Sequence, residues 1–292
     1  MPKLRVVSYN IHKGRSLSGR DSLPELRLGL HGLHPDILFL QEVQGRNEQR
    51  ANLDAQHESL AAALHMQVAY GCNAVRQMTD HGNALLSRFP ILSFENEDVS
   101  DHPLEQRGLL HGEIDIEGRR VHCFVVHLGL FAGSRMRQIQ TMAQRIERLV
   151  GPQEPILIAG DFNDWRNELA PLFVKQLGVF EVFTHASQSS GDVPRLRDSV
   201  KQIKQVLRGE QPLAALSTVL SRDRQLRHNQ LSMNGADSLQ PPPKTYPSKF
   251  PMLRLDRIYQ RGFAVTRAQV LRGKPWSLLS DHSPIVADLE LE

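Results

Sequence analysis

Polar side chains stand at the ends of several apolar, strand-like segments of this sequence. They are Asn10, Glu42, His127, Asp161 with Asn163, Asp256, and the pair Asp281 and His282. A single acid in such a place is typical of a turn or a helix cap. Carboxylates, amides and imidazoles at five or more strand ends are harder to explain by capping. Because strand ends of a layered α/β fold converge on one rim, we expect these residues to form a single polar site.

The residue types indicate hydrolysis of a phosphoester. Carboxylate and amide oxygens are hard ligands that suit Mg²⁺ or Mn²⁺, whereas the Cys and His spacing of a zinc site is absent from the sequence. Histidines beside carboxylates can donate hydrogen bonds to an anionic transition state or protonate a leaving group. A metal with few protein ligands and such donors is the equipment for attack on phosphorus. The sequence lacks the glycine-rich loops of nucleotide and dinucleotide sites and the Gly-x-Ser-x-Gly turn of serine hydrolases.

Composition places the chain among ordinary soluble proteins. It has 292 residues, of which 40% are hydrophobic and 23% charged, with a net charge of +3. That mild excess permits an anionic substrate without demanding nucleic acid, which usually needs a concentrated basic surface. Two cysteines are too few for a disulfide framework, and the N-terminus lacks the apolar segment of a signal peptide. We therefore expect a cytoplasmic protein without a transmembrane helix.

Apolar patterning predicts two packed sheets with helices outside. The predicted strands are residues 4–9, 36–40, 84–87, 109–116, 121–126, 155–159, 253–259, 264–271 and 284–291. An amphipathic helix is predicted over 134–150, and similar patterns cover 23–33 and 53–64. The mixture of hairpin-like and crossover connections disfavours a purely parallel sheet.

Residues 187–243 differ from the rest of the chain. They begin with Ser-Gln-Ser-Ser-Gly and end with three prolines, and two short helical patterns rich in Arg and Lys lie between. The segment is interpreted as a helical or loop insertion that could act as a lid, with a loop of no particular role as the alternative.

Seven short motifs follow one another along the chain. They are Ser8-Tyr9-Asn10-Ile11, Leu40-Gln41-Glu42-Val43, Gly82-Asn83-Ala84-Leu85-Leu86-Ser87-Arg88, Val126-His127-Leu128, Gly160-Asp161-Phe162-Asn163, Leu255-Asp256-Arg257-Ile258 and Ser280-Asp281-His282-Ser283-Pro284. In this order they resemble the motifs of the endonuclease/exonuclease/phosphatase superfamily, which has the deoxyribonuclease-I-like fold. The resemblance implies one domain over residues 1–292, a four-layer α/β sandwich of two mixed β-sheets flanked by helices, and a divalent-metal-dependent phosphoric ester hydrolase.

The resemblance also implies roles for the acids and amides. Glu42 would bind the metal directly, with Asn10 and Asp281 completing the shell around metal and phosphate. Asp161 would orient or deprotonate the attacking water, and Asn163 would lie beside it and contact the substrate. The implied cofactor is Mg²⁺ or Mn²⁺.

The histidines complete the implied machinery. His282 would stabilise the charge on phosphate, and His127 would assist the leaving group. The carboxylate of Asp256 would hold His282, because a carboxylate bonded to one imidazole nitrogen favours the charged ring and aims the other N–H outward. Arg107 begins a strand on the side of the site, where it could hold a phosphate oxygen; a surface arginine is the alternative.

The substrate is less sharply indicated. Val43-Gln44 follows the Gln-Glu pair where abasic-site nucleases tend to carry Thr-Lys, and His127 stands where they tend to carry Tyr. Residues 244–258 resemble a bacterial branch that is closer to sphingomyelinase-like and phosphatase-like members. We expect a monomeric phosphodiesterase or phosphatase acting on a small-molecule or lipid phosphoester, with transient membrane-surface contact. The alternative is a Mg²⁺-dependent nuclease acting on DNA or RNA, and an idle binding module is disfavoured because every motif position is filled.

Overall fold

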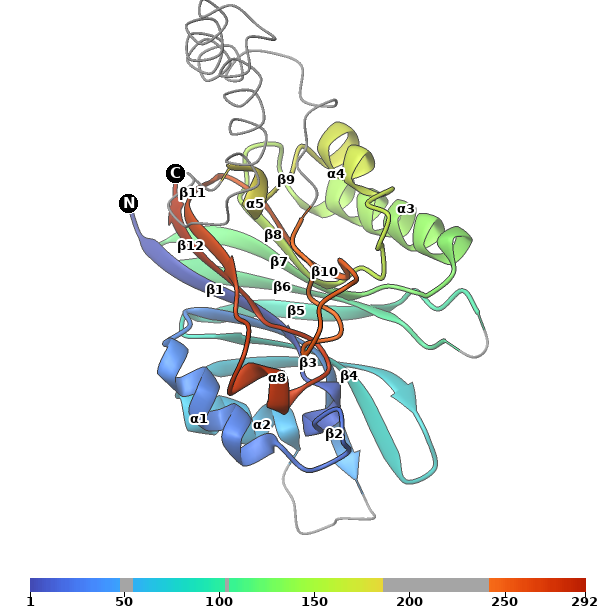
Figure 1. The fold of residues 1–292 in the computed structure, drawn as a ribbon. Helices are drawn as coiled ribbons and strands as arrows, with labels where there is room; N and C mark the ends of the chain where they lie inside the picture. Colours follow the sequence, from blue (N-terminus) through green and yellow to red (C-terminus); the bar gives the residue numbers. More distant parts are fainter. Residues whose placement is uncertain (48–54, 103–104, 186–241) are drawn as a thin grey trace, which may run out of the picture. The chain divides into compact units, whose positions relative to one another are not determined.

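The structure is a computed structural model, and it describes residues 1–47, 55–102, 105–185 and 242–292 (Figure 1). The described residues form two six-stranded mixed β-sheets, with strand orders β11-β12-β1-β2-β4-β3 and β5-β6-β7-β8-β10-β9. The first sheet contains β1 (Lys3–Asn10), β2 (Ile37–Asn47), β3 (Gln67–Val75), β4 (Thr79–Ser87), β11 (Phe263–Val270) and β12 (Ile285–Leu291). The second contains β5 (Ile91–Asp98), β6 (Gly108–Ile116), β7 (Arg119–His127), β8 (Ile156–Asp161), β9 (Phe180–Glu181) and β10 (Asp256–Arg261).

Helices cover the outer face of each sheet (Figure 1). Those on the first sheet are α1 (Leu23–Leu33), α2 (Gln56–Leu64) and α8 (Trp276–Leu279). Those on the second are α3 (Ala132–Leu149) and α4 (Ala170–Leu177). The short helices η1 (His12–Gly14) and α5 (Val182–His185) follow β1 and β9. The predicted α/β sandwich is confirmed.

Three apolar clusters hold these layers together. The central one lies between the sheets and joins Val6 and Phe39 of the first to Val125 and Ile258 of the second. The outer two lie between each sheet and its helices. Strands such as β4, β7 and β8 are buried on both faces over most of their length, because one face meets the other sheet and the other meets helices; this explains why they carry apolar runs that could be predicted. β3, β5 and β9 were not predicted; the side chains of β5 are mostly exposed, and it therefore lacks an apolar run.

Strand direction explains where the polar residues gather. β1 and β2 are parallel neighbours in the first sheet, and β7 and β8 are parallel neighbours in the second. β12 runs antiparallel to β1, and β10 runs antiparallel to β8. The carboxyl ends of β1, β2, β7 and β8 therefore lie at the same edge as the amino ends of β10 and β12. We call this edge of the two sheets the rim.

The predicted insertion at 187–243 falls almost wholly on residues 186–241, which lie outside the described part of the chain. Its form and the single-domain organisation therefore stay predictions. None of the described helices is both long and apolar enough to cross a membrane.

Candidate active site

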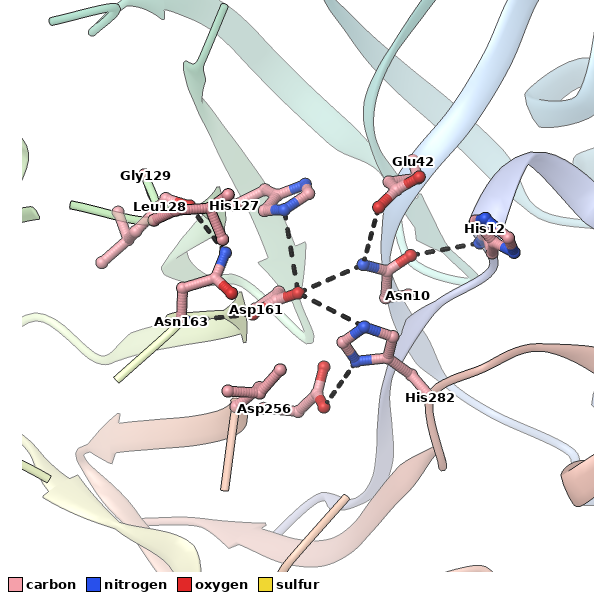
Figure 2. A network of polar contacts seen from close by, with 12 residues as sticks. Asn10, His12, Glu42, His127, Leu128, Gly129, Asp161, Asn163, Asp256 and His282 are labelled. Carbon is pink, nitrogen blue, oxygen red and sulfur yellow. Dashed lines mark hydrogen bonds and ion pairs between the residues drawn. The ribbon is translucent and has the colours of Figure 1, made fainter. Parts of the chain in front are cut away.

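Asp161 lies at the centre of the polar contacts at the rim (Figure 2). Its Oδ2 accepts a hydrogen bond from Asn10 Nδ2 at 3.2 Å. The Nε2 atoms of His282 and His127 lie 3.6 and 3.7 Å from the same oxygen. The Asn10 contact joins the first sheet to the second, and Asp161 is only 2% exposed. Three side-chain nitrogens therefore lie within 3.7 Å of one buried carboxylate oxygen.

The backbone around Asp161 is shaped to present this carboxylate. Gly160 has φ 150°, and a Cβ added there would collide with the carbonyl oxygen of Val126 on β7. Asp161 Oδ1 accepts from the backbone N–H of Asn163 at 3.0 Å. Asn163 has φ 49° and donates from Nδ2 to the carbonyl of Leu128 at 2.9 Å. The Asn163 side chain thus ties the ends of β7 and β8 together.

Glu42 occupies a bulge in β2, where pairing with β4 shifts register between Leu40 and Val43. Its φ of 53° is left-handed, a conformation that costs a non-glycine residue about 1–2 kcal/mol. The carboxylate lies 3.3 Å from Lys13 Nζ and accepts from Asn10 Nδ2 at 3.3 Å. Burial pushes the pKa of Glu42 upward, but the neighbouring His127, Lys13 and Asn10 outweigh it and hold the pKa at about 2. Glu42 is therefore ionised at neutral pH.

His282 and Asp256 form a buried pair. His282 Nδ1 lies 2.9 Å from Asp256 Oδ2. Burial alone would lower the pKa of His282, but the charges of Asp256 and Asp161 outweigh burial and raise it to about 10. The ring is thus an imidazolium whose Nε2–H faces Asp161. Tyr246 lies against it, with ring centroids 4.9 Å apart.

His127 is the second imidazole beside Asp161, and it is neutral. Burial and the positive charge of Arg107 lower its pKa to about 4. Arg107 itself donates from Nε to the carbonyl of Leu128 at 3.2 Å, which places its guanidinium near the site but anchored to the residue that follows β7. Opposite pKa shifts of neighbouring groups are typical of acid–base machinery.

The donor set fits a hard divalent cation. Glu42, Asp161 and Asp281 supply carboxylate oxygens of the kind that Mg²⁺ and Mn²⁺ prefer. Asp281 accepts from Ser280 Oγ at 3.3 Å and lies 3.8 Å from His12 Nδ1. Ligand atoms of Asp161, Asp256 and His282 also lie within 4.8 Å of one another, but the charged ring of His282 has no lone pair to offer a cation, so this group could hold an ion only after the ring loses a proton.

Asn10 departs from a simple ligand geometry. Its amide nitrogen faces Glu42 and Asp161, while its Oδ1 accepts from the backbone N–H of His12 at 3.1 Å. Ligation through Oδ1 would therefore require the amide to rotate, whereas binding a phosphate oxygen through Nδ2 would not.

Most residues that the sequence predicted for the site come together. Asn10, Glu42, His127, Asp161, Asn163, Asp256 and His282 share one network of contacts (Figure 2). Asp281 lies next to this network through His12 and Ser280, and Arg107 reaches it through Leu128. Their chemical roles stay predictions.

Four further residues lie at or beside the site but were given no role in the sequence analysis. His12 and Lys13 follow Asn10 in η1, and their nearness to that motif was the available signal. Tyr246 stands in a loop without apolar periodicity. Arg257, whose side chain is fully buried, donates to the carbonyls of Asp256 and Asp164 at 3.0 Å each and so links the start of β10 to the segment after β8.

Comparison with known proteins identifies relatives over the whole chain. The model of the Endonuclease/Exonuclease/phosphatase family matches residues 7–282. The uncharacterized protein YbhP of Escherichia coli K12 is 33% identical over 296 residues, which cover 98% of this chain and 96% of YbhP.

Solved structures share the fold. An endonuclease/exonuclease/phosphatase from Beutenbergia cavernae has a TM-score of 0.66 at 19% identity and covers 100% of this chain and 72% of its own. D. rerio TDP2 complexed with single strand DNA product has a TM-score of 0.62 at 17% identity and covers 99% and 100%. The match over the motifs, the two-sheet sandwich and the metal-compatible rim agree with one another. The chain belongs to the endonuclease/exonuclease/phosphatase family, whose members are hydrolases of phosphoester bonds that generally use divalent metal ions.

Proposed function

We propose that the chain is a Mg²⁺- or Mn²⁺-dependent phosphodiesterase or phosphatase that hydrolyses a small or lipid phosphoester by attack of water on phosphorus. The observation that carries the proposal is the arrangement at Asp161, a buried carboxylate within reach of Asn10, His127 and the charged His282. A general base beside two imidazoles and an amide suits a reaction in which a proton leaves water while charge develops on phosphate.

Glu42 is the direct metal ligand in this proposal, and Asn10 and Asp281 complete the shell around metal and phosphate. The bound cation would polarise the phosphate and neutralise its negative charge. A hard cation is expected because the donors are oxygen atoms. Glu42 is already ionised, as ligation requires.

The remaining residues act on water and phosphate. Asp161 accepts the proton of the attacking water, and Asn163 keeps the loop after β8 in place through its bond to Leu128. His282, charged and fixed by Asp256, directs its Nε2–H at the developing phosphate charge. His127 donates a hydrogen bond to the leaving oxygen, and Arg107 supplies positive charge nearby.

Exposed apolar side chains beside the rim favour a substrate with an apolar part. Leu130 and Phe131 follow His127 by three and four residues and are 54% and 55% exposed, and Trp165 follows Asn163 and is 40% exposed. Arg135 connects them, since it donates to the carbonyl of Leu130 at 2.6 Å and lies 5.3 Å from the centre of the Trp165 ring. We call Leu130, Phe131 and Trp165 the apolar lip, and propose that it contacts acyl chains at a membrane surface.

A substrate panel tests this proposal. Purified protein with Mg²⁺ or Mn²⁺ is offered p-nitrophenyl phosphate, bis-p-nitrophenyl phosphate, phospholipid vesicles, and single- and double-stranded DNA and RNA. We expect phosphoester or phospholipid hydrolysis to be far faster than that of duplex DNA. Replacing Leu130, Phe131 and Trp165 by Ser should lower kcat/KM for phospholipid more than for the water-soluble esters.

A matched control comes from β5. Leu92 and Phe94 are as exposed, at 52% and 53%, but they lie on the edge strand β5 and not in the apolar lip. Their replacement by Ser should leave kcat/KM unchanged for phospholipid and for the water-soluble esters. Equal effects of the two sets of variants would refute the lipid contact. Faster cleavage of nucleic acid than of any other substrate would establish instead the nuclease alternative, for which the fold shared with DNA-bound TDP2 is the precedent.

A further inference from the structure

A second group of metal-ligating side chains lies on the outer face of the second sheet. His111 and Glu113 stand two residues apart on β6, and His122 pairs with Glu113 from β7. Side chains that alternate with them point into the core between the sheets: Leu110, Ile114, Val121 and Cys123. Because successive side chains of a strand point to opposite faces, His111, Glu113 and His122 share the face under α3. His122 is five residues from His127 along β7, or about 17 Å, so this group is separate from the rim.

The three side chains converge on one point. His111 Nε2 lies 3.0 Å from His122 Nδ1, and one ligand atom from each of His111, Glu113 and His122 lies within 4.8 Å of the others. His122 Nε2 lies 3.2 Å from Glu154 Oε2. His111 is 4% exposed and His122 is fully buried, whereas the Glu113 side chain is 22% exposed. Two buried imidazoles and one accessible carboxylate therefore meet at a place that solvent reaches from the Glu113 side.

We propose that His111, Glu113 and His122 form a second metal site, which binds Zn²⁺ or a similar borderline-soft cation. Two imidazoles and a carboxylate are typical zinc ligands, and imidazole disfavours Mg²⁺ relative to Zn²⁺. Glu154 completes the arrangement, because a carboxylate on the far nitrogen of a ligating histidine fixes the ring and its tautomer.

The two imidazole nitrogens need little adjustment. Zn–N bonds of about 2.0–2.1 Å in a tetrahedral site place two imidazole nitrogens about 3.3 Å apart. The His111–His122 contact at 3.0 Å must therefore open by a few tenths of an ångström. The Glu113 carboxylate lies 3.4 Å from the guanidinium of the exposed Arg120 and would give up this contact to bind the cation. Exposed ion pairs of this kind are weak and cost little to exchange.

The two rings can bind a cation without gaining or losing a proton. A Glu154 carboxylate accepts from Nε2–H of His122, which leaves a lone pair on His122 Nδ1, and His111 Nε2–H donates to it. Ligation requires His111 to carry its proton on Nδ1 instead, so that Nε2 offers a lone pair. Burial lowers the pKa of both rings, and both are therefore neutral at pH 7. The bound ion would join β6 and β7 and, through Glu154, the turn before β8.

Metal binding by the full-length protein tests the proposal. The protein is stripped with chelator and then dialysed against Zn²⁺ in excess Mg²⁺, and bound zinc is measured by mass spectrometry. Glu113→Gln and Glu154→Gln are the informative variants, because both side chains are partly exposed and neither change removes a buried ring. Glu147→Gln on the exposed face of α3 is the matched control, and His282→Asn tests whether zinc has bound at the rim instead.

We expect the parent, Glu147→Gln and His282→Asn to retain one equivalent of zinc. Glu113→Gln and Glu154→Gln should bind it at least about 10-fold more weakly. Co²⁺ in place of Zn²⁺ should give the visible absorption of a low-symmetry site, and Glu113→Gln should weaken that absorption at the same Co²⁺ concentration. No zinc retained over excess Mg²⁺, parent-like binding by Glu113→Gln, or loss of zinc in His282→Asn would each overturn the proposal.

Discussion

His282 at the rim and His111 on the outer face of the second sheet are both buried imidazoles, yet their pKa values move in opposite directions. Burial lowers the pKa of each. At His282 the bonded Asp256 and the nearby Asp161 outweigh burial and raise the pKa to about 10. At His111 burial, the neighbouring His122 and the positive charge of Arg145 lower it to about 3, with only Glu95 acting in the other direction.

The number and closeness of the carboxylates therefore decides whether a buried ring is charged. At the rim, carboxylates hold a cation ready for an anionic substrate. At the β6–β7 pair, the rings stay neutral and keep the lone pairs that a metal needs. Neighbouring groups thus prepare the same residue type for two different ligands. Variants at either site can test this difference.

The largest expected effect is on catalysis at the rim. Asp161→Asn should lower kcat by about 10²–10⁴-fold, because the amide cannot accept the proton of water. The free energy of unfolding should change by at most about 1 kcal/mol, since the amide oxygen can still accept from Asn163 N. Steady-state rates and thermal unfolding of the same preparation provide the measurement. A large drop in Tm would show that Asp161 is chiefly structural.

Asp256→Asn should have a smaller effect on rate, about 10–100-fold, because Asp256 acts through His282. Loss of the carboxylate should also bring the pKa of His282 down toward or below its ordinary value, whereas that of His111 should not move. Imidazole resonances followed by NMR against pH in chelator measure both rings. An unchanged pKa of His282 would contradict the account of the pair.

Stability of the metal-free protein should carry two opposite pH dependences. His111, with its lowered pKa, contributes stability that is present above pH 6.5 and lost as the pH falls toward 3. His282, with its raised pKa, contributes stability that is present below pH 6.5 and lost as the pH rises toward 10. Each should amount to about 1–2 kcal/mol over the first 1.5 pH units. Denaturant titrations at several pH values measure the free energy of unfolding. His111→Gln should reduce its pH dependence below pH 6.5, and His282→Asn should reduce it above pH 6.5. The opposite result for the two variants would refute the assignment.

The smallest effect is expected on nucleic acid binding. Charges at the rim are largely compensated, since Asp256 pairs with His282 and Glu42 with Lys13. We expect weak binding to duplex DNA that is lost by physiological salt. The logarithm of the binding constant should fall only slightly with the logarithm of the salt concentration, because each contacted phosphate adds about −0.9 to that slope and few are contacted. Fluorescence anisotropy across a salt series measures it. Submicromolar affinity at physiological salt, with cleavage that needs Mg²⁺ and His282, would favour a nuclease.

Much of the rim could be predicted because its residues directly follow or precede apolar strands. Asn10, His127 and Asp161 end runs whose burial is visible in the sequence, and the ordered motifs predicted the family. The contact of Asn10 with Asp161 could not be predicted from spacing, because it depends on how two sheets pack. Lys13 was missed since it lies in a short turn with no periodic pattern.

The β6–β7 histidines were missed for another reason. His111 and Glu113 interrupt an apolar strand at alternate positions, a pattern that indicates one shared face, but their partner His122 is on the next strand. Only strand pairing brings Glu113 opposite His122. The segment 187–243, the monomeric state and the cytoplasmic location remain predictions.

Metal-dependent hydrolysis by the parent and by Glu42→Gln tests the central claim most directly. Initial rates with bis-p-nitrophenyl phosphate and with phospholipid vesicles are measured in chelator, then with Mg²⁺ or Mn²⁺ restored. The account predicts no turnover in chelator, recovery by the parent on addition of metal, and little recovery by Glu42→Gln, because an amide is a poor substitute for a carboxylate ligand. Full activity in excess chelator, or turnover by Glu42→Gln equal to that of the parent, would contradict it.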